Sequence, residues 1–409
     1  MPGPSRLLDP LRDFLRQEAA SGVLLLGAAI VALVLANSPM GDAWEALWET
    51  HVGVFVGDQV FGMTLHHVVN DGLMVVFFLV VGLEIKRELV LGELRDPRTA
   101  MLPMVAAVGG AVVPAVIYLL LNAGGPGASG WGVPMATDIA FALGILALVG
   151  RGLPVALRVF LATLAIVDDL IAVVVIALFY TSSLDLLGVA EVVVVMALLI
   201  VANRRGVRSL AVYGGLGIAL WLGVLVSGVH ATIAGVLLAA TIPAVVGAAP
   251  HDGRPTRSPL VRLEDLLHPW SAYLVVPVFA LANAGVRLSG GLDSLTSTVG
   301  LGIIVGLVVG KPIGILGSTW LLTRLTRTQL PDGLTWPRML ALGILAGIGF
   351  TMSLFIAELA SFDAAGQRDA KLGVLAATAI AASIGWVAMR LATRGDRGSD
   401  APAPDHRTH

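Results

Sequence analysis

Four ionisable side chains lie deep within apolar stretches of the chain, where their types and spacing could do chemistry. Asp168 and Asp169 are adjacent near the middle of the apolar stretch 153–179. Asp138 and Lys311 each lie in another such stretch. A charged side chain in hydrocarbon costs about 2.5–3.5 kcal/mol on insertion scales, so each of the four is a candidate functional group. Three acids and one base leave a net negative site, which favours a hard cation or protons.

The two adjacent carboxylates cannot have equivalent surroundings. Neighbouring residues on a helix point about 100° apart, so we expect one member of the Asp168–Asp169 pair to face a cavity and the other a neighbouring helix. A helix end or hidden loop is the alternative, but apolar residues continue on both sides without Gly or Pro. A buried lysine keeps its charge opposite a carboxylate, so Lys311 is expected to pair with one of the acids. Snorkelling of its side chain to an interface is the alternative.

Two apolar stretches are interrupted in a way that breaks a membrane helix. The first carries Pro134 and a Gly-rich lead-in before Thr137 and Asp138, and the second, 343–351, carries three glycines. A broken helix exposes N–H groups and a positive dipole end, which a carboxylate and a hydroxyl can satisfy. A simple N-cap is the alternative for Asp138. Broken segments in corresponding positions mark the ion site of inverted-repeat transporters, and spans three to five and ten to twelve would be the repeats.

The composition indicates an integral membrane protein that is all α-helical. Apolar residue types make up 56% of the 409 residues and charged types only 13%, about half of the share of roughly 25% in soluble domains. The absence of cysteine excludes disulfide-stapled ectodomains and thiolate metal sites. Since about 20 apolar residues cross a bilayer, we predict twelve transmembrane helices. They lie near 22–36, 68–85, 99–121, 132–149, 153–179, 186–202, 207–226, 229–247, 266–286, 297–322, 339–358 and 372–391.

The distribution of basic residues predicts the orientation of these helices. With a cytoplasmic N-terminus, 22 of the 26 Lys and Arg residues fall in inside segments, only Arg287, Arg368 and Lys371 fall outside, and Lys311 lies within an apolar stretch. Lys and Arg collect on the cytoplasmic side of short loops. We therefore expect a multi-pass membrane protein, in contact with lipid and with both termini in the cytoplasm.

Three segments are expected to differ from the twelve-helix domain at 21–392. Residues 1–20 carry an apolar stripe with mixed charge and predict a cytoplasmic interfacial helix, with a signal peptide as the alternative. Residues 51–67 alternate apolar and polar types around Gly and predict an extracytoplasmic β-hairpin. An isolated hairpin is marginal in water, so we expect a homodimer. Residues 393–409 have nothing to bury and predict a disordered cytoplasmic tail.

Titratable groups also gather near the ends of the predicted helices. Glu84 and Glu88 are four residues apart and share a helix face, where their mutual repulsion makes protonation sensitive to pH. Glu264 belongs to an inner cluster with Asp265 and His268. His230 lies at the outer start of a span, where a hydrogen-bonded interface residue is the alternative to a pH sensor. No phosphate loop, nucleophile elbow or zinc motif is present, so neither a cofactor nor a nucleic-acid partner is expected.

From about residue 21 to residue 390 the sequence closely resembles the bacterial NhaA-type Na+/H+ antiporters. Six blocks that follow one another in the order of that family carry the resemblance: FFLVVGLEIKREL at 77–89, ATDIAF at 136–141, AIVDDL at 165–170, GVHAT at 228–232, GKP at 310–312 and AGIGFTMS at 346–353. The family is itself an example from which the inverted-repeat rule was drawn, so that rule is not independent support.

The resemblance implies a secondary transporter of the bacterial cytoplasmic membrane, not an enzyme, that exports Na+ or Li+ as external H+ enters, two protons per sodium. Asp168 and Asp169 match the family's Na+-binding pair and Lys311 the partner of the first aspartate. The broken fourth helix is matched by Thr137 and Asp138, and the positions associated with pH response are matched by Glu84, Glu264 and His230. Asp265 stands where His is expected and Val261 where a basic residue is expected, which puts the pH profile in doubt.

Three other functions are weighed against antiport. An intramembrane aspartyl protease needs one aspartate from each of two helices, typically after Gly-x-Gly, whereas Asp138 follows Ala-Thr. A cation channel needs a selectivity filter or a ring of repeated charges, and a single asymmetric chain shows neither. Sodium-coupled symport of an organic solute is the remaining alternative.

Overall fold

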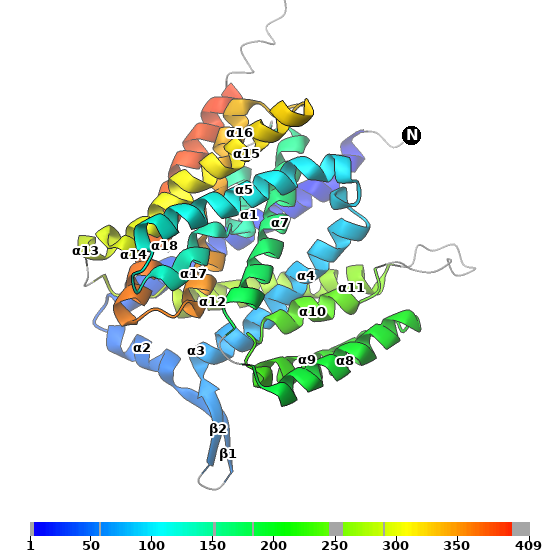
Figure 1. Ribbon diagram of the computed structural model, residues 1–409, viewed down its shortest axis with the longest axis vertical. Helices are drawn as coiled ribbons and strands as arrows, with labels where there is room; N and C mark the ends of the chain where they lie inside the picture. Colours follow the sequence, from blue (N-terminus) through cyan, green and yellow to red (C-terminus); the bar gives the residue numbers. More distant parts are fainter. Residues whose placement is uncertain are drawn as a thin grey trace, which may run out of the picture.

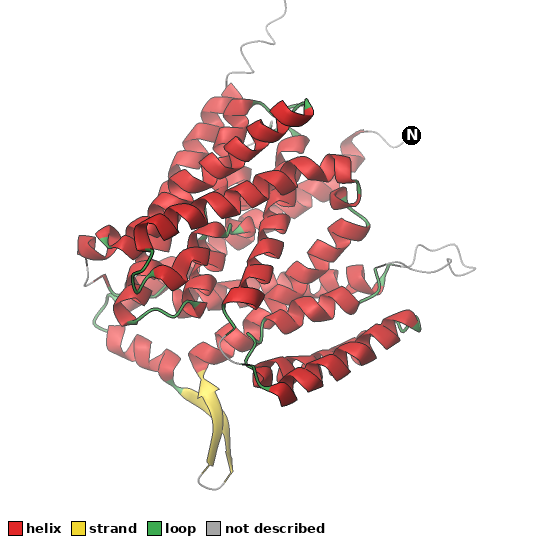
Figure 2. Cartoon of the chain, viewed as in Figure 1, coloured by secondary structure: helices red, strands yellow, loops and turns green. Residues whose placement is uncertain are grey.

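The computed structural model describes residues 4–56, 59–149, 153–181, 184–244, 257–288 and 291–394. Within these ranges the chain is a bundle of helices from which one two-stranded hairpin projects (Figures 1 and 2). Elements of the first half are α1 (Pro4–Ala36), α2 (Gly41–Glu49), β1 (His51–Val56), β2 (Gln59–Thr64), α3 (Leu65–His67), η1 (Val68–Leu73), α4 (Met74–Val90), η2 (Glu93–Arg95), α5 (Pro97–Asn122), η3 (Ala128–Met135), α6 (Ile139–Val149), α7 (Val155–Phe179), α8 (Leu186–Arg204) and α9 (Leu210–Ser227).

The described residues of the second half form helices joined by short loops, with no strand. Its elements are α10 (Ile233–Thr241), α11 (Pro259–Trp270), η4 (Ser271–Val275), α12 (Val276–Asn283), α13 (Gly291–Thr296), α14 (Thr298–Val305), η6 (Gly306–Gly310), α15 (Lys311–Thr326), α16 (Trp336–Ala346), α17 (Phe350–Leu359) and α18 (Ala364–Arg394). The π-helical segments η1, η4 and η6 join α3 to α4, α11 to α12 and α14 to α15 without ending the helix. Each of these joined helices therefore forms one long run.

The predicted polytopic all-α class is confirmed. In the described part of the chain nine helical runs are long and apolar enough to span a bilayer, and two bent helix pairs raise this number to eleven. The predicted stretch 229–247 differs, because α10 has only nine residues and the description stops at 244. Nine helical residues rise about 13.5 Å, less than half of a hydrocarbon core of about 30 Å. Gly228, whose φ is 80°, ends α9, and α10 begins only at Ile233.

The predicted hairpin is confirmed, with a shorter extent. Strands β1 and β2 pair antiparallel in a register that runs from His51 opposite Thr64 to Val56 opposite Gln59. The predicted segment extended to residue 67, but the strand ends at Thr64, whose hydroxyl accepts a hydrogen bond from the His67 backbone N–H. This N-cap starts the helical run that continues as η1 and α4.

The two ends of the chain bear on the predicted domain limits. Helix α1 is continuous from Pro4 to Ala36, so the segment predicted as an interfacial helix leads into the first predicted span without a break. Helix α18 continues to Arg394. Residues 395–409, most of the predicted tail, lie outside the described residues.

Helices α5 and α15 lie side by side because glycines let their backbones approach (Figure 1). A Cβ atom at Gly314 of α15 would lie 2.1 Å from the carbonyl oxygen of Gly109 on α5. Small residues at such crossings permit the close packing that holds membrane helices together. This contact matters for the site, because α15 begins at Lys311.

Gly314→Ala should lower the free energy of unfolding by about 1–3 kcal/mol, since the added methyl group has no space against backbone atoms. Gly317→Ala is the matched control on the same helix, because a Cβ there meets nothing within 4 Å. Thermal unfolding of both purified variants in detergent measures the difference. Equal midpoints would contradict the close approach.

Candidate ion-binding site

Two broken helices meet in the middle of the bundle. The first break is the extended segment 136–138 between η3 and α6, and the second is the segment 347–349 between α16 and α17, whose axes differ by 43°. The backbone N–H of Asp138 donates to the carbonyl of Ile348 at 2.7 Å, and the Thr137 hydroxyl donates to the carbonyl of Ala346 at 2.8 Å. Backbone groups that the breaks release are thus satisfied by the opposite break.

The carboxylate of Asp138 serves both half-helices. Its Oδ1 accepts a hydrogen bond from the Phe141 N–H at 2.9 Å, in the first turn of α6. Its Oδ2 accepts from the Thr351 N–H at 3.1 Å and from the Thr351 hydroxyl at 2.5 Å, at the start of α17. Two positive helix ends therefore point at one buried carboxylate. No role was predicted for Thr351, although its place at the end of the Gly-broken segment 343–351 was the signal.

Asp168 and Lys311 form an ion pair that has no exposed side-chain surface. Lys311 Nζ lies 2.8 Å from Oδ2 and 3.0 Å from Oδ1 of Asp168, and it also donates to the carbonyl of Met135. Helix α7 supplies the aspartate from its middle, and α15 supplies the lysine from its first residue. The two helices and η3 are therefore tied together at one point.

Asp169 points in a different direction from Asp168. Only 2% of Asp169 is exposed, and its Oδ1 has no hydrogen-bond partner among the described residues. Together with Asp138 and Thr351 it lines a cavity of about 70 Å³, the small cavity, which Asp168 does not line. The two adjacent carboxylates thus face different surroundings, one a lysine and the other a cavity.

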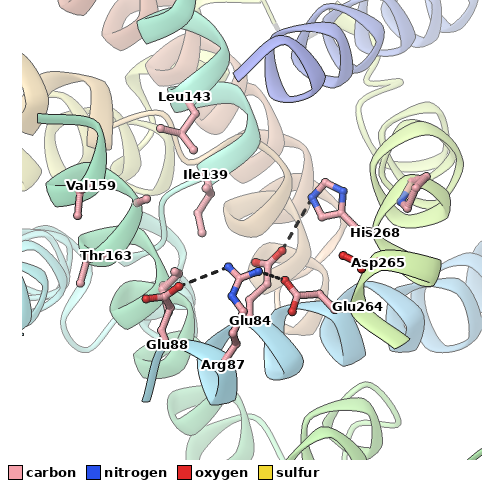
Figure 3. A pocket seen from close by; sticks show the side chains of 13 residues that line it. Glu84, Arg87, Glu88, Ile139, Leu143, Val159, Thr163, Glu264, Asp265 and His268 are labelled. Atoms are coloured by element: carbon pink, nitrogen blue, oxygen red, sulfur yellow. Dashed lines mark hydrogen bonds and ion pairs between the residues drawn. The ribbon is translucent and has the colours of Figure 1, made fainter. Parts of the chain in front are cut away.

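A second, wide cavity of about 410 Å³ adjoins the small one. Glu84, Ile139 and His268 line both cavities, so they form the boundary between them. The lining of the wide cavity comes from α4, α6, α7 and α11 (Figure 3). This arrangement gives Asp138 and Asp169 a polar approach from one end of the bundle.

Charged side chains in the wide cavity form a network (Figure 3). Arg87 pairs with Glu264, and its Nη2 lies 3.4 Å from Oε1 of Glu88. Nε2 of His268 lies 3.9 Å from Oε1 of Glu84. Three of the predicted pH-response residues, Glu84, Glu88 and Glu264, are thereby brought into one cavity. The sequence offered no sign of a partner for Arg87, and only the packing of α4 against α11 reveals its pairing with Glu264.

His230 does not line either of these cavities. Its Nε2 lies 2.6 Å from the carbonyl oxygen of Tyr180, which agrees with the alternative of a hydrogen-bonded structural residue. The Tyr180 hydroxyl in turn donates to the carbonyl of Ser129 and accepts from the Gly132 N–H. Burial raises the pKa of Tyr180 to about 12, so the hydroxyl keeps its proton and holds η3 in place.

The donor set around the small cavity suits a transported ion better than a resident metal. Within the described ranges no group of three or more His, Asp or Glu side chains is arranged to hold a metal ion. Asp138 and Asp169 offer carboxylate oxygens, and hard cations accept such oxygens together with carbonyls, hydroxyls and water. Crossed broken helices around buried carboxylates, in a polytopic bundle, define a secondary transporter.

The chain belongs to the Na+/H+ antiporter 1 family, whose model matches residues 12–389. Its relatives include proteins named Na(+)/H(+) antiporter NhaA. That of Wolinella succinogenes is 44% identical and covers 96% of this chain and 95% of its own length. The protein from Vibrio cholerae is 46% identical over 94% and 98%, and that from Shewanella amazonensis is 48% identical over 95% and 99%. The resemblance seen in the sequence is therefore confirmed.

Lys311→Met should destabilise the protein by about 3–5 kcal/mol, because it leaves the buried carboxylate of Asp168 without its charge partner. The double variant Lys311→Met/Asp168→Asn should recover most of this loss, since no unpaired charge remains. Thermal unfolding of the purified variants in detergent measures both effects. A double variant no more stable than the single one would contradict the assigned pairing.

Proposed function

We propose that the protein exports Na+ or Li+ from the cytoplasm in exchange for external H+, with two protons entering for each cation. The observation that carries the proposal is the small cavity, where Asp169 presents a carboxylate oxygen without a partner beside Asp138. The names of the relatives, all Na(+)/H(+) antiporters, support the same exchange.

Competition for the same carboxylates couples the two ions. A proton on Asp169 removes the charge that attracts Na+, and a bound Na+ disfavours that proton. Asp168 is occupied by Lys311, so it joins the cation site only when the cation displaces the lysine ammonium. Asp169 and the displaced Lys311 are then the two groups that exchange one proton each. Thr137 and Asp138 hold the broken helices in register for this exchange.

The wide cavity is assigned to the cytoplasmic face. Under the orientation that the Lys and Arg distribution predicts, both termini and Glu84 lie inside, and the hairpin lies outside. Cytoplasmic Na+ would enter through the wide cavity and reach Asp138 and Asp169 past Glu84 and His268. Movement of one helix bundle against the other would then expose the same site to the outside.

The stoichiometry makes transport electrogenic. Two protons in for one Na+ out moves one net positive charge inward. At about 2.3 kcal/mol per charge per 100 mV, the membrane potential can drive Na+ outward against its gradient. No ATP site is required.

The network of the wide cavity is assigned to pH regulation. Protonation of Glu84, Glu88 or Glu264 would weaken their contacts with Arg87 and His268, which lie along the approach to the site. Asp265 pairs with Arg257, whose Nη1 lies 2.6 Å from Oδ2 of Asp265. Because Asp265 stands where the family pattern has histidine, we expect the pH at which transport begins to differ from that of family members with histidine there. The hairpin is the surface assigned to a homodimer within the lipid membrane.

Asp169→Asn and Asp168→Asn should each abolish exchange while the protein still folds and inserts, because an amide neither binds protons nor attracts Na+. Asp332→Asn, at an exposed aspartate outside the cavities, is the matched control and should keep full activity. The measurement is Na+-driven dequenching of a pH dye in everted vesicles. Substantial dequenching with either site variant would sink the proposal.

Addition of Na+ alone to the purified protein in weakly buffered detergent should release protons. The physical reason is the direct competition for Asp169, which needs no third molecule. A pH electrode or dye measures the release, and Asp169→Asn serves as the blank. Release only after an organic solute is added would favour sodium-coupled symport instead.

A further inference from the structure

Two helical runs of the second half each contain a π-helical segment that ends two residues before a proline. Segment η4 ends at Val275 and is followed by Pro277, and segment η6 ends at Gly310 and is followed by Pro312. A proline inside an α-helix has no N–H, and its ring clashes with the carbonyl four residues before it. Hydrogen bonds that reach back five residues instead of four widen the helix locally, so each run continues through its proline.

The π-helical segment η4 leaves the carbonyl of Ala272 without the donor that an α-helix or a π-helix would supply. In an α-helix this carbonyl would accept from the N–H of Val276, but the Val276 N–H donates to the carbonyl of Ser271. The next residue along the chain is Pro277, which has no N–H to donate. Both positions from which α-helical and π-helical hydrogen bonds reach Ala272 are therefore lost.

The freed carbonyl lies on the face of its helix that borders the small cavity. Ala272 and Val276, one turn apart, both line this cavity, as does Ser271. A helical carbonyl points along the axis towards the residue four positions further on, so the oxygen of Ala272 lies between two lining residues. Asp138 and Asp169 line the same cavity from other segments. One neutral oxygen and two carboxylates therefore border the small cavity.

The corresponding carbonyl of η6 has different surroundings. The Lys311 N–H donates to the carbonyl of Gly306, so the carbonyl of Leu307 loses its donors in the same way. That oxygen lies against the second break, where a Cβ atom at Gly347 would be 2.4 Å from it. Leu307 does not line the small cavity. Of the two freed carbonyls, that of Ala272 is therefore the one within reach of a ligand in the cavity.

The carboxylates of the small cavity cannot complete the coordination of a cation alone. Oδ1 of Asp138 accepts from the Phe141 N–H, and its Oδ2 accepts twice from Thr351. Asp169 offers Oδ1, which has no hydrogen-bond partner among the described residues. Hard cations in proteins take about six oxygen ligands, and carbonyls and water complete the sets that carboxylates begin. Further neutral oxygens are therefore needed beside these two acids.

We propose that the carbonyl oxygen of Ala272 is a ligand of the transported cation in the small cavity, together with the carboxylates of Asp138 and Asp169. The proposal rests on the proposed function, because it adds a ligand to the same cation site. Main-chain oxygens of locally unwound helices coordinate Na+ in secondary transporters. Pro277 acts as a positioning residue, since it keeps this carbonyl free and does not itself touch the ion.

A carbonyl ligand affects the two transported ions differently. An amide carbonyl accepts hydrogen bonds and binds cations, but it takes up no proton in the pH range of transport. The carboxylates bind either ion, so they determine the competition between Na+ and H+. The carbonyl of Ala272 therefore raises the affinity for Na+ without changing the affinity for H+. Loss of this ligand should weaken Na+ binding by the same factor at every pH.

Pro277→Ala restores the missing N–H and tests the ligand. If the π-helical segment persists, the new N–H reaches the carbonyl of Ala272, and if the run reverts to an α-helix, the Val276 N–H reaches it instead. In both cases the carbonyl is occupied, and Na+ affinity should fall about tenfold, the effect of one lost polar contact. Equilibrium binding of radioactive Na+ to the purified protein in detergent, at several pH values, measures this affinity.

Pro103→Ala is the matched control, because Pro103 is also a buried proline inside a helix, α5, and lines neither the small nor the wide cavity. It should bind Na+ as the parent does. Pro277→Gly restores the same N–H without a methyl group, so it separates the hydrogen bond from the side chain. Full Na+ affinity in either Pro277 variant, an equal loss in the control, or a loss confined to low pH would overturn the ligand assignment.

The binding measurement separates this proposal from the proposed function. If Pro277→Ala binds Na+ more weakly but the parent shows no Na+-driven proton movement in everted vesicles, the proposed exchange fails and the ligand stands. If the parent exchanges the ions and the variant binds Na+ as tightly as the parent, the ligand fails and the proposed exchange stands.

Discussion

The structure depends on one constraint, which is the burial of three carboxylates and a lysine inside an apolar helical bundle. Each of these groups needs a partner at membrane depth, because water is not there to supply one. Lys311 supplies the partner of Asp168, and the half-helix ends supply three donors to Asp138. Asp169 is the exception, since its Oδ1 has no hydrogen-bond partner among the described residues. The need for partners at the other two acids thus leaves Asp169 as the carboxylate with an unpartnered oxygen beside the small cavity.

The same constraint explains why two helices are broken at their crossing. In an unbroken helix the backbone N–H groups donate to carbonyls of the same helix, so none is available to a carboxylate. Breaks at 136–138 and 347–349 release such groups, and each break satisfies the other through the bond from Asp138 to Ile348. Gly347 is required there, because a Cβ atom would lie 2.4 Å from the carbonyl oxygen of Leu307. The same few residues therefore permit the breaks in the backbone and supply hydrogen-bond donors to the carboxylate.

Much of the fold and part of the site could be predicted from the sequence. Apolar runs and family motifs predicted the helices and the family, and the alternation at 51–67 predicted the hairpin. The predictions were less accurate where tertiary packing intervenes: α10 is shorter than the predicted span, and the hairpin ends at Thr64 because a helix cap begins there. His230 lies against the Tyr180 carbonyl and not in the cavities, which residue type alone does not reveal.

The sequence by itself determined that the protein lies in a membrane, which family it belongs to, and that Asp138, Asp168 and Asp169 lie within apolar stretches, since apolar run length and motif order are local properties. Only the tertiary structure decided that Asp168 faces Lys311 while Asp169 faces the small cavity, and that Arg87 pairs with Glu264. These pairs join residues far apart in the chain. The distances between them depend on how the helices pack, and that packing cannot be read from the residue type at each position.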